Sequence, residues 1–202
     1  MRSLPQTGAD PIAFASAVEA IYAAAVPSRR PDALQAIADC FGDEGAILIF
    51  NREDGSTALM ASPSPILQAA APEYNRHWWR HDFRLQRSFE RGYIANSDTI
   101  TDRHVISMEE MESHPFYTEY LAAHGLKWFA GATLCPDPRA WVGLSLQRLG
   151  NKPPYTDEEL AFLSRIGRHA ENALRLGIRL LDAELATCRR ATPWRASAWA
   201  SS

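Results

Sequence analysis

One stretch of the chain, YNRHWWRHDFR, concentrates side chains that can bind a metal ion, stack on rings or carry charge. His77 and His81 are four residues apart, a spacing that lets two imidazoles on one helix meet one metal ion, and Asp82 follows directly. The glutamate of an HExxH motif is missing, and His104 and His114 come only further along the chain. The pattern therefore favours two surface histidines over a metal site, and it defines no cofactor.

The same stretch also spaces three arginines by four residues. Arg76, Arg80 and Arg84 would share one face of a helix, beside Trp78 and Trp79, which could stack on nucleic-acid bases. The whole chain, however, has 21 basic and 24 acidic residues and a formal net charge of −3, so its surface does not attract a phosphate backbone in general. We therefore expect these arginines to form a solvated face and predict no nucleic-acid binding by this stretch.

A pocket for a small organic molecule is the third possibility, and it draws on several segments. Such sites have mostly apolar walls with a few orienting polar groups, and Gly131 and Gly143 would leave space on two predicted strands. The predicted ligand-binding residues are Tyr74, Trp78, Asp82, Phe83, Phe116, Tyr117, Trp128, Trp141 and Ser145. The alternative is a filled aromatic core, because a domain of this size needs aromatic side chains inside in any case. Both interpretations stay open at this point.

Motifs of enzymes are missing from the sequence. It contains no GxSxG, no Walker loop and no glycine-rich dinucleotide fingerprint. Cys40, Cys135 and Cys188 are widely separated and have no CxxC spacing, so they indicate neither a disulfide framework nor a structural zinc site. We predict that the protein is not an enzyme.

Length and composition indicate one domain with appendages. A chain of 202 residues is long enough for one continuous core and short for two ordinary domains. No run approaches the roughly 20 apolar residues of a membrane span, and Met1–Thr7 lacks the basic start and apolar segment of a signal peptide. We expect a cytoplasmic protein with no membrane partner.

The elements that would position these residues begin with two helices and a hairpin. Asp10 is suited to cap the first helix, Gly42 to end the second, and the Asp54-Gly55 pair is a good hairpin signal. The predicted elements are the helices Pro11–Ala25 and Leu34–Phe41 and the strands Gly45–Phe50 and Thr57–Ala61. The stretch from Pro65 to His124 then carries helical rather than strand signals, with helices predicted over Pro72–Phe83 and Met108–Ala123.

A second hairpin follows, because two β-rich arms flank the prolines of Pro136–Arg139. The arms are Trp128–Leu134 and Trp141–Leu149. In the second arm, large apolar residues alternate with small or polar ones: Val142, Leu144 and Leu146 against Gly143, Ser145 and Gln147. One face should therefore pack heavily while the other is small and polar. The order of elements predicts an α+β fold, an antiparallel sheet flanked by helices rather than βαβ winding.

The last predicted element is one long helix over residues 156–188. Thr156 and Glu159 have capping-box spacing. An apolar stripe follows at intervals of three and four: Leu163, Ile166, Ala170, Leu174, Ile178, Leu181 and Leu185. Its later part matches a coiled-coil seam, so we expect the helix to cover the sheet first and then to pair with a second copy in a homodimer. Residues 189–202 lose the periodicity, and we predict an irregular, disordered tail.

The plan resembles a GAF/PAS-like sensory domain. More narrowly, scattered positions are similar to the N-terminal sensory halves of bacterial LuxR-type transcriptional regulators. They are Ser97-Asp98, Ser113 to Tyr117, Tyr120-Leu121, His124 to Leu126 and Phe162 to Leu176. The resemblance covers residues 11–186.

This resemblance implies a sensory core over residues 11–155 that binds a small molecule and signals through the dimeric C-terminal helix. It also implies a helix-turn-helix domain that contacts DNA, and no such pattern follows Leu185 in this chain. The acyl-homoserine-lactone receptors of the superfamily have a Trp four residues before a Tyr and then an Asp-Pro pair. This chain has Ala70 before Tyr74, and Phe83 after Asp82, which speaks against that ligand class and leaves the ligand unidentified. The competing interpretation is a ligand-free dimerisation or interaction module with a filled aromatic core.

Overall fold

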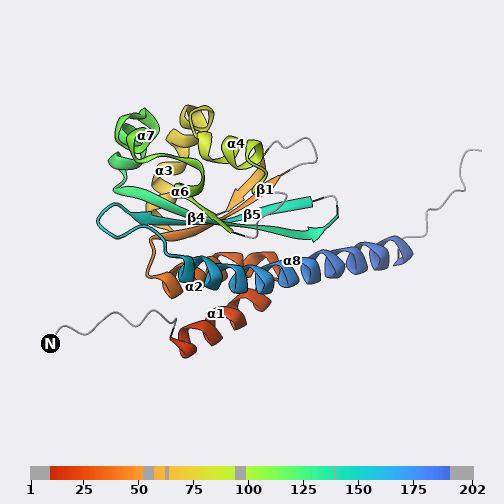
Figure 1. The fold of residues 1–202 in the computed structure, drawn as a ribbon. Coiled ribbons are helices and arrows are strands. Elements are labelled where there is room, and N and C mark those ends of the chain that lie inside the picture. Colours follow the sequence, from red (N-terminus) through yellow and green to blue (C-terminus); the bar gives the residue numbers. More distant parts are fainter. Residues whose placement is uncertain (1–9, 52–56, 62–63, 94–98, 139, 192–202) are drawn as a thin grey trace, which may run out of the picture.

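A five-stranded antiparallel sheet forms the centre of the protein. The computed structural model describes residues 10–51, 57–61, 64–93, 99–138 and 140–191. Within them the strand order is β2-β1-β5-β4-β3. The strands are β1 (Gly45–Asn51), β2 (Thr57–Ala61), β3 (Thr99–Thr101), β4 (Leu126–Asp137) and β5 (Ala140–Leu149). Helices lie on both sides of this sheet (Figure 1), so the predicted GAF-like α+β architecture is confirmed.

Three helices lie on one side of the sheet, which we call the back face; two of them contact the strands, and the first helix of the chain packs on those two (Figure 1). They are α1 (Pro11–Ala23), α2 (Arg30–Phe41) and α8 (Asp157–Ala191), with a short 3₁₀ turn, η1 (Pro27–Arg29), between the first two. The Asp10 carboxylate caps α1 by accepting a hydrogen bond from the Ile12 backbone N–H at 3.0 Å. Gly42 ends α2 in the left-handed conformation, at φ 60°, which glycine adopts without strain. The two predicted N-terminal helices are therefore confirmed.

Short helices over residues 65–121 lie on the other side of the sheet, and we call them the helical layer (Figure 1). They are α3 (Pro65–Arg76), the 3₁₀ turn η2 (Trp78–Arg80), α4 (Phe83–Glu90), α6 (Asp102–Val105), α7 (Met108–Ser113) and the π-helical η3 (Phe116–Leu121). This layer agrees with the predicted helical middle of the chain, although that part of the chain also contributes the strand β3 to the sheet, which was not expected.

The helix predicted over Pro72–Phe83 is wrong in its boundaries. Ser64 starts α3 earlier, because its hydroxyl accepts a backbone hydrogen bond at 3.4 Å and Pro65 takes the first helical position. Pro72 therefore lies inside α3 and not in its first turn. At His77 the backbone turns to φ −136° and ψ −54°, which ends the helix, and the residues after it divide between η2 and α4.

The helix predicted over Met108–Ala123 is interrupted. Ser107 and Glu110 form a capping box at the start of α7, but the chain leaves the helical conformation at His114, at ψ 129°. The residue before a proline is biased away from the helix, and Pro115 follows. The second part is η3, in which four aromatic or apolar side chains are buried.

The predicted β4–β5 hairpin is confirmed, with pairing from Leu126 and Leu149 to Asp137 and Ala140. The strands reach further into the proline-rich turn than predicted, and Arg139 lies outside the described residues. The alternation in β5 has the expected result. The residues Val142, Leu144 and Leu146 are at most 2% exposed, and the alternate residues Gly143, Ser145 and Gln147 point to the helical layer. The Asp54-Gly55 pair also lies outside the described residues.

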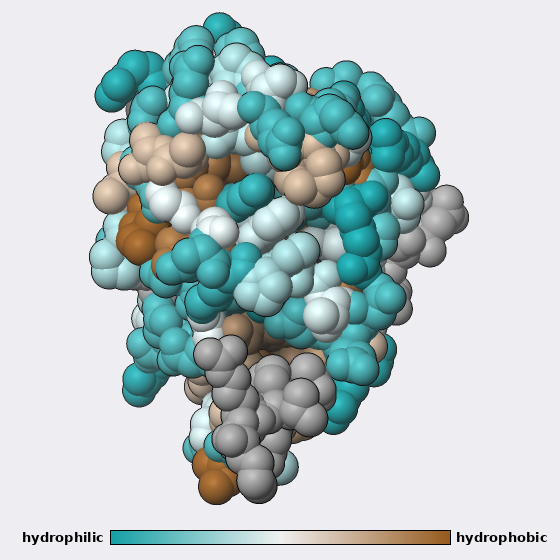
Figure 2. Space-filling view, turned by 60° about the vertical axis from the view of Figure 1, so that its left-hand side comes forward, coloured by the Kyte–Doolittle hydropathy of each residue, from teal (hydrophilic) through white to brown (hydrophobic). Residues whose placement is uncertain are grey.

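The surface agrees with a chain that buries most of its apolar side chains. Hydrophilic residues dominate the face in Figure 2, and hydrophobic residues appear there in restricted patches. In the part of the chain that the structure describes, no helix is both long and apolar enough to cross a membrane.

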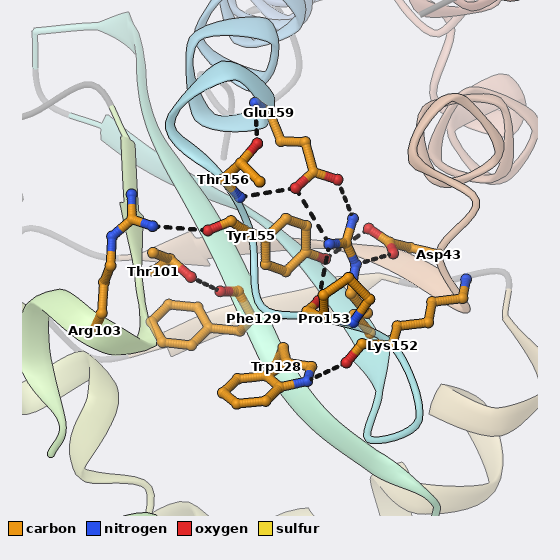
Figure 3. A network of polar contacts seen from close by, with 11 residues as sticks. Asp43, Thr101, Arg103, Trp128, Phe129, Lys152, Pro153, Tyr155, Thr156 and Glu159 are labelled. Atoms are coloured by element: carbon orange, nitrogen blue, oxygen red, sulfur yellow. Dashed lines mark hydrogen bonds and ion pairs between the residues drawn. The ribbon is translucent and has the colours of Figure 1, made fainter. Parts of the chain in front are cut away.

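A buried polar network fixes the start of α8 to the sheet (Figure 3). Thr156 and Glu159 form the predicted capping box, each side chain accepting the other's backbone N–H. Arg148 on β5 donates to Glu159 and to Asp43, both at 2.6 Å, and the Tyr155 hydroxyl donates to the other Asp43 oxygen, also at 2.6 Å. The Arg148 and Asp43 side chains are 4% and 0% exposed, so this ion pair is shielded from water.

The long helix α8 extends past the edge of the sheet (Figure 1). Its apolar stripe changes environment along the way. Leu163, Ile166, Ala170 and Leu174 are buried against the domain, whereas Ile178, Leu181 and Leu185 are 36%, 56% and 48% exposed. The helix continues through Ala191, into the segment predicted as an irregular tail, and residues 192–202 lie outside the described part of the chain.

Candidate functional site

A cavity of about 440 Å³ lies between the sheet and the helical layer. Its floor is formed by β1, β4 and β5, and its roof by α3 and the end of η3. Pockets for small organic ligands have volumes of about 300–1,000 Å³ and mostly apolar walls with a few polar groups. The size and the mixed lining make this cavity the candidate ligand site.

The floor is hollow because its side chains are small where neighbouring strands meet. Ser145 pairs with Ile47 on one side and with Gly131 on the other, and Gly143 pairs with Ile49. A Cβ atom at Gly143 would meet its nearest neighbour, the Ile49 Cβ, at 3.7 Å, an ordinary contact. Space therefore remains above the strands at this place, as the small and polar face of β5 predicts.

One wall of the cavity carries a cluster of three polar side chains. The Tyr74 hydroxyl donates to Asp82 Oδ2 at 3.1 Å. Arg84 donates from Nε to Asp82 Oδ1 and from Nη2 to Oδ2, both at 2.8 Å, and its backbone N–H donates to Oδ1 at 3.2 Å. The side chains of Arg84 and Asp82 are 11% and 9% exposed. A tight ion pair of opposite charges therefore forms part of the lining.

Electrostatics in this cluster follow from burial and from the ion pair. Burial alone would lower the pKa of Arg84, but the charge and hydrogen bonds of Asp82 outweigh it and raise that pKa above its usual value. Burial, together with the Asp82 charge, also raises the pKa of Tyr74, so this residue stays a neutral phenol. The Arg84 guanidinium carbon lies 4.7 Å from the ring centre of Phe116 and 5.0 Å from that of Phe129, which adds cation–π attraction.

A second buried carboxyl group connects the helical layer with the sheet. Asp102 accepts hydrogen bonds from the Tyr117 hydroxyl at 2.7 Å and from the Phe129 backbone N–H on β4 at 2.8 Å. Burial raises the pKa of Asp102 to about 6, against the opposing effect of the nearby Arg84 charge and these two hydrogen bonds. Asp102 therefore holds the layer to the sheet beside the cavity without lining it.

The predicted ligand-binding residues occupy three different places. Tyr74, Asp82, Trp141 and Ser145 line the cavity. The rings of Trp78, Phe83, Phe116 and Tyr117 pack behind that lining; Trp78 stacks on the cavity residue Tyr120 at a centroid distance of 5.6 Å. Trp128 lies elsewhere and donates from Nε1 to the Lys152 carbonyl at 2.8 Å (Figure 3).

The expectation that Arg76, Arg80 and Arg84 share a solvated face is wrong for Arg84. Arg76 and Arg80 are exposed, but Arg84 is buried at 9% exposure. The reason is the end of α3 at His77, after which the helical spacing of four residues no longer relates these side chains. Arg84, which was predicted to be solvated, is instead part of the cavity wall.

The two histidines of the opening stretch lie together on the surface. The rings of His77 and His81 are 4.9 Å apart and both residues are exposed. No cluster of three or more potential metal ligands occurs among the residues that the structure describes.

Several cavity residues were not predicted. Ile47, Ile49 and Gln147 belong to the alternating faces of β1 and β5, so the period-two pattern could have found them. Tyr120 lies in a segment expected to be helical, where its direction could not be assigned. Arg84 had no local signal, because its role depends on the turn that brings Asp82 and Tyr74 together.

Comparisons with known proteins identify solved structures of similar architecture. No family model matches the chain, and no curated protein matches it. The VqsR LBD domain from Pseudomonas aeruginosa is similar at a TM-score of 0.57 and 15% identity, over 83% of this chain and 97% of that one. The N-acylhomoserine lactone dependent LuxR family transcription factor CepR2 from Burkholderia cenocepacia gives 0.57 and 12%, over 82% and 96%. SdiA in complex with octanoyl-rac-glycerol gives 0.53 and 15%, over 89% and 69%. The chain thus has the fold of the ligand-binding domains of LuxR-type regulators.

Proposed function

We propose that the protein is the sensory domain of a LuxR-type transcriptional regulator and binds a small molecule between the sheet and the helical layer. The observation that carries the proposal is the cavity of about 440 Å³ on the small-residue face of β5. The shared fold supports it, as does SdiA, a protein of this fold whose structure contains octanoyl-rac-glycerol. Tyr74, Asp82, Trp141 and Ser145 line the proposed site. The other predicted residues, Trp78, Phe83, Phe116, Tyr117 and Trp128, would support its shape.

The competing proposal is a ligand-free interaction module with a filled aromatic core. In such a core, aromatic rings would occupy the space above the strands. The rings of Trp78, Phe116 and Tyr120 instead pack on one another at centroid distances of 5.4 to 6.4 Å, while Gly131 and Gly143 leave the floor open. This arrangement favours the ligand-binding proposal.

Mass spectrometry of the purified protein, first under native and then under denaturing conditions, tests it. We expect a small molecule that leaves on unfolding. The variant Gly143→Leu should lose that molecule, because its side chain would project into the cavity, while Gly143→Ala should keep it. Circular dichroism would establish that both variants fold. Release of nothing from the wild type, even after incubation with octanoyl glycerol, would favour the interaction module.

The output would run through α8 in a homodimer. Gly167 of α8 packs on the back of β4, where an added Cβ would lie 3.3 Å from Leu134 and 3.5 Å from Ala132, so movements of the cavity floor would reach this helix. Beyond the sheet, Ile178, Leu181 and Leu185 are exposed at coiled-coil spacing and available to a second copy. Ligand binding would then change how these residues pair and so bias an attached DNA-binding domain.

Light scattering with size-exclusion chromatography tests the dimer. The double variant Ile178→Glu with Leu181→Glu should be monomeric, whereas Arg179→Glu, a change between the two on the same helix, should leave the subunit count unaltered. An unchanged dimer in the double variant would remove the output-helix proposal. A cytoplasmic location and DNA contact only through a separate helix-turn-helix domain complete the proposed function.

A further inference from the structure

We propose that Arg84, together with Tyr74, saturates Asp82 and thereby makes the cavity selective for uncharged amphiphiles, so that the ligand is held without a contact to the Asp82 carboxylate. The inference rests on the proposed function, since it concerns the chemistry of the ligand in the same cavity. It assigns Arg84 as the residue that determines specificity and Asp82 as the residue that positions it.

Asp82 accepts as many hydrogen bonds as its carboxylate has acceptor sites. A carboxylate offers about four acceptor sites on its two oxygens. Oδ1 accepts from the Arg84 backbone N–H at 3.2 Å and from Nε at 2.8 Å, and Oδ2 accepts from Nη2 at 2.8 Å and from the Tyr74 hydroxyl at 3.1 Å. All four sites are thus used within the protein. An amide N–H or an ammonium group of a ligand would find no acceptor on this carboxylate.

The charges of the described residues that line the cavity cancel each other. Arg84 and Asp82 are the one cation and the one anion among the described residues that line the cavity, and they neutralise each other. The remaining nitrogen of the guanidinium, Nη1, is buried without a hydrogen-bond partner among those residues, and the rings of Phe116 and Phe129 pack against the group. An ionised ligand would have to enter a largely apolar cavity without a free counter-ion, which is costly.

The groups that remain available define the head of the ligand. The Tyr74 oxygen, having donated its proton to Asp82, can still accept a hydrogen bond. Ser145 accepts from Gln147 Nε2 at 2.9 Å and can still donate its own hydroxyl proton. A hydroxyl or an ester group matches this pair of one acceptor and one donor, and its oxygen can also accept from Arg84 Nη1, which has no partner among the described residues. The apolar body of the ligand would lie against Ile47, Leu67 and Leu121.

Isothermal titration calorimetry with matched probes tests the selectivity. The probes are octanol and 1-octanoylglycerol, which are uncharged, and octanoate and octylammonium, which are ionised at neutral pH. We expect both uncharged probes to bind the wild-type protein at least about tenfold more tightly than either charged probe, because an unpaired ion must be desolvated. A charged probe that binds as tightly as octanol would overturn the inference and leave the proposed function standing. Binding of none of the probes would count against both.

Variants of the ion pair test the role of Arg84. Arg84→Met keeps the length of the side chain, removes the cation and frees the two Asp82 acceptor sites that the guanidinium occupies, so octylammonium should become the tightest probe. The double variant Asp82→Asn with Arg84→Met removes both charges and should retain the preference for octanol. It also serves if the single variant does not fold, since replacing a buried ion pair as a whole is often well tolerated. Arg80→Met, at an exposed arginine, is the matched control. Unchanged probe preferences in Arg84→Met would refute the assignment.

Discussion

The two faces of the central sheet have opposite properties, although they share the same strands. On the back face, the β5 residues Val142, Leu144 and Leu146 are large apolar side chains that are at most 2% exposed. On the other face, the residues between them are Gly143, Ser145 and Gln147, and a cavity lies above them. Alternation along one strand thus separates the side chains that hold the fold from those that leave room for a ligand.

Arg148 and Arg84, which are both buried, also differ in their roles on the two faces. Arg148 on the back face joins three distant segments, since it contacts Asp43 before β1 and Glu159 in the first turn of α8. Arg84 beside the cavity pairs with Asp82, only two residues away. Long-range pairing makes Arg148 a determinant of stability, whereas the local pair of Arg84 can change without separating elements of the fold.

The largest effect is expected for Arg148→Met. This change leaves Asp43, whose side chain is 0% exposed, without its cationic partner. Breaking a buried ion pair on one side costs about 3–5 kcal/mol of unfolding free energy. Urea unfolding followed by circular dichroism measures it. Arg29→Met is the control, because the Arg29–Asp32 pair is exposed at 66% and 67% and should contribute less than about 1 kcal/mol. Equal losses in the two variants would contradict the assigned role of Arg148.

The next largest loss of unfolding free energy is expected on β5, where two adjacent residues can be compared. Leu146 is 0% exposed on the back face, so Leu146→Ala should cost about 2–5 kcal/mol through lost contacts and a new cavity. Ser145→Ala, on the cavity face, removes only the acceptor of the Gln147 hydrogen bond and should cost about 1 kcal/mol or less. The same unfolding titration measures both. Similar losses would mean that the two faces do not differ in their contribution to stability.

A pH dependence should come from Asp102, which connects the helical layer with the sheet. Burial raises its pKa from the usual 3.8 to about 6. The folded protein therefore binds a proton more readily than the unfolded chain, so stability decreases as the pH rises from about 4 to 6, by roughly 2–3 kcal/mol. Unfolding titrations at pH 4.5 and pH 7 measure the change. Asp102→Asn cannot titrate and should show a smaller decrease over this range; an identical decrease in the variant would exclude Asp102 as its source.

Local signals in the sequence predicted most of the fold. The cap at Asp10, the stop at Gly42 and the capping box of Thr156 and Glu159 depend on neighbouring residues and are confirmed. The end of α3 at His77 was missed, because a tertiary arrangement overrides the helical pattern of the stretch around it.

The candidate site was harder to predict than the fold. Tyr74 lines the cavity and Phe116 lies behind it, yet both are aromatic residues in segments expected to be helical. Whether an aromatic side chain fills the core or faces a cavity depends on what packs opposite to it, which the residue type does not encode. The period-two pattern of β5 was informative, because small residues on one face of a strand leave space wherever that face is covered.

The smallest predicted change in stability is a gain, and it is expected at one of two glycines of the sheet that can be compared. Gly143 does not have a positive φ, and a Cβ there would meet Ile49 at an ordinary 3.7 Å. Gly143→Ala should therefore stabilise the protein by about 0.4–1 kcal/mol, because alanine restricts the unfolded chain more than glycine does. Gly45→Ala should instead destabilise it, since the added Cβ would lie only 2.4 Å from the Ser64 side chain. Thermal unfolding measures both changes. If Gly143→Ala destabilised the protein as much as Gly45→Ala, the floor of the cavity would be packed like the rest of the core, and the contrast between the two faces would be lost.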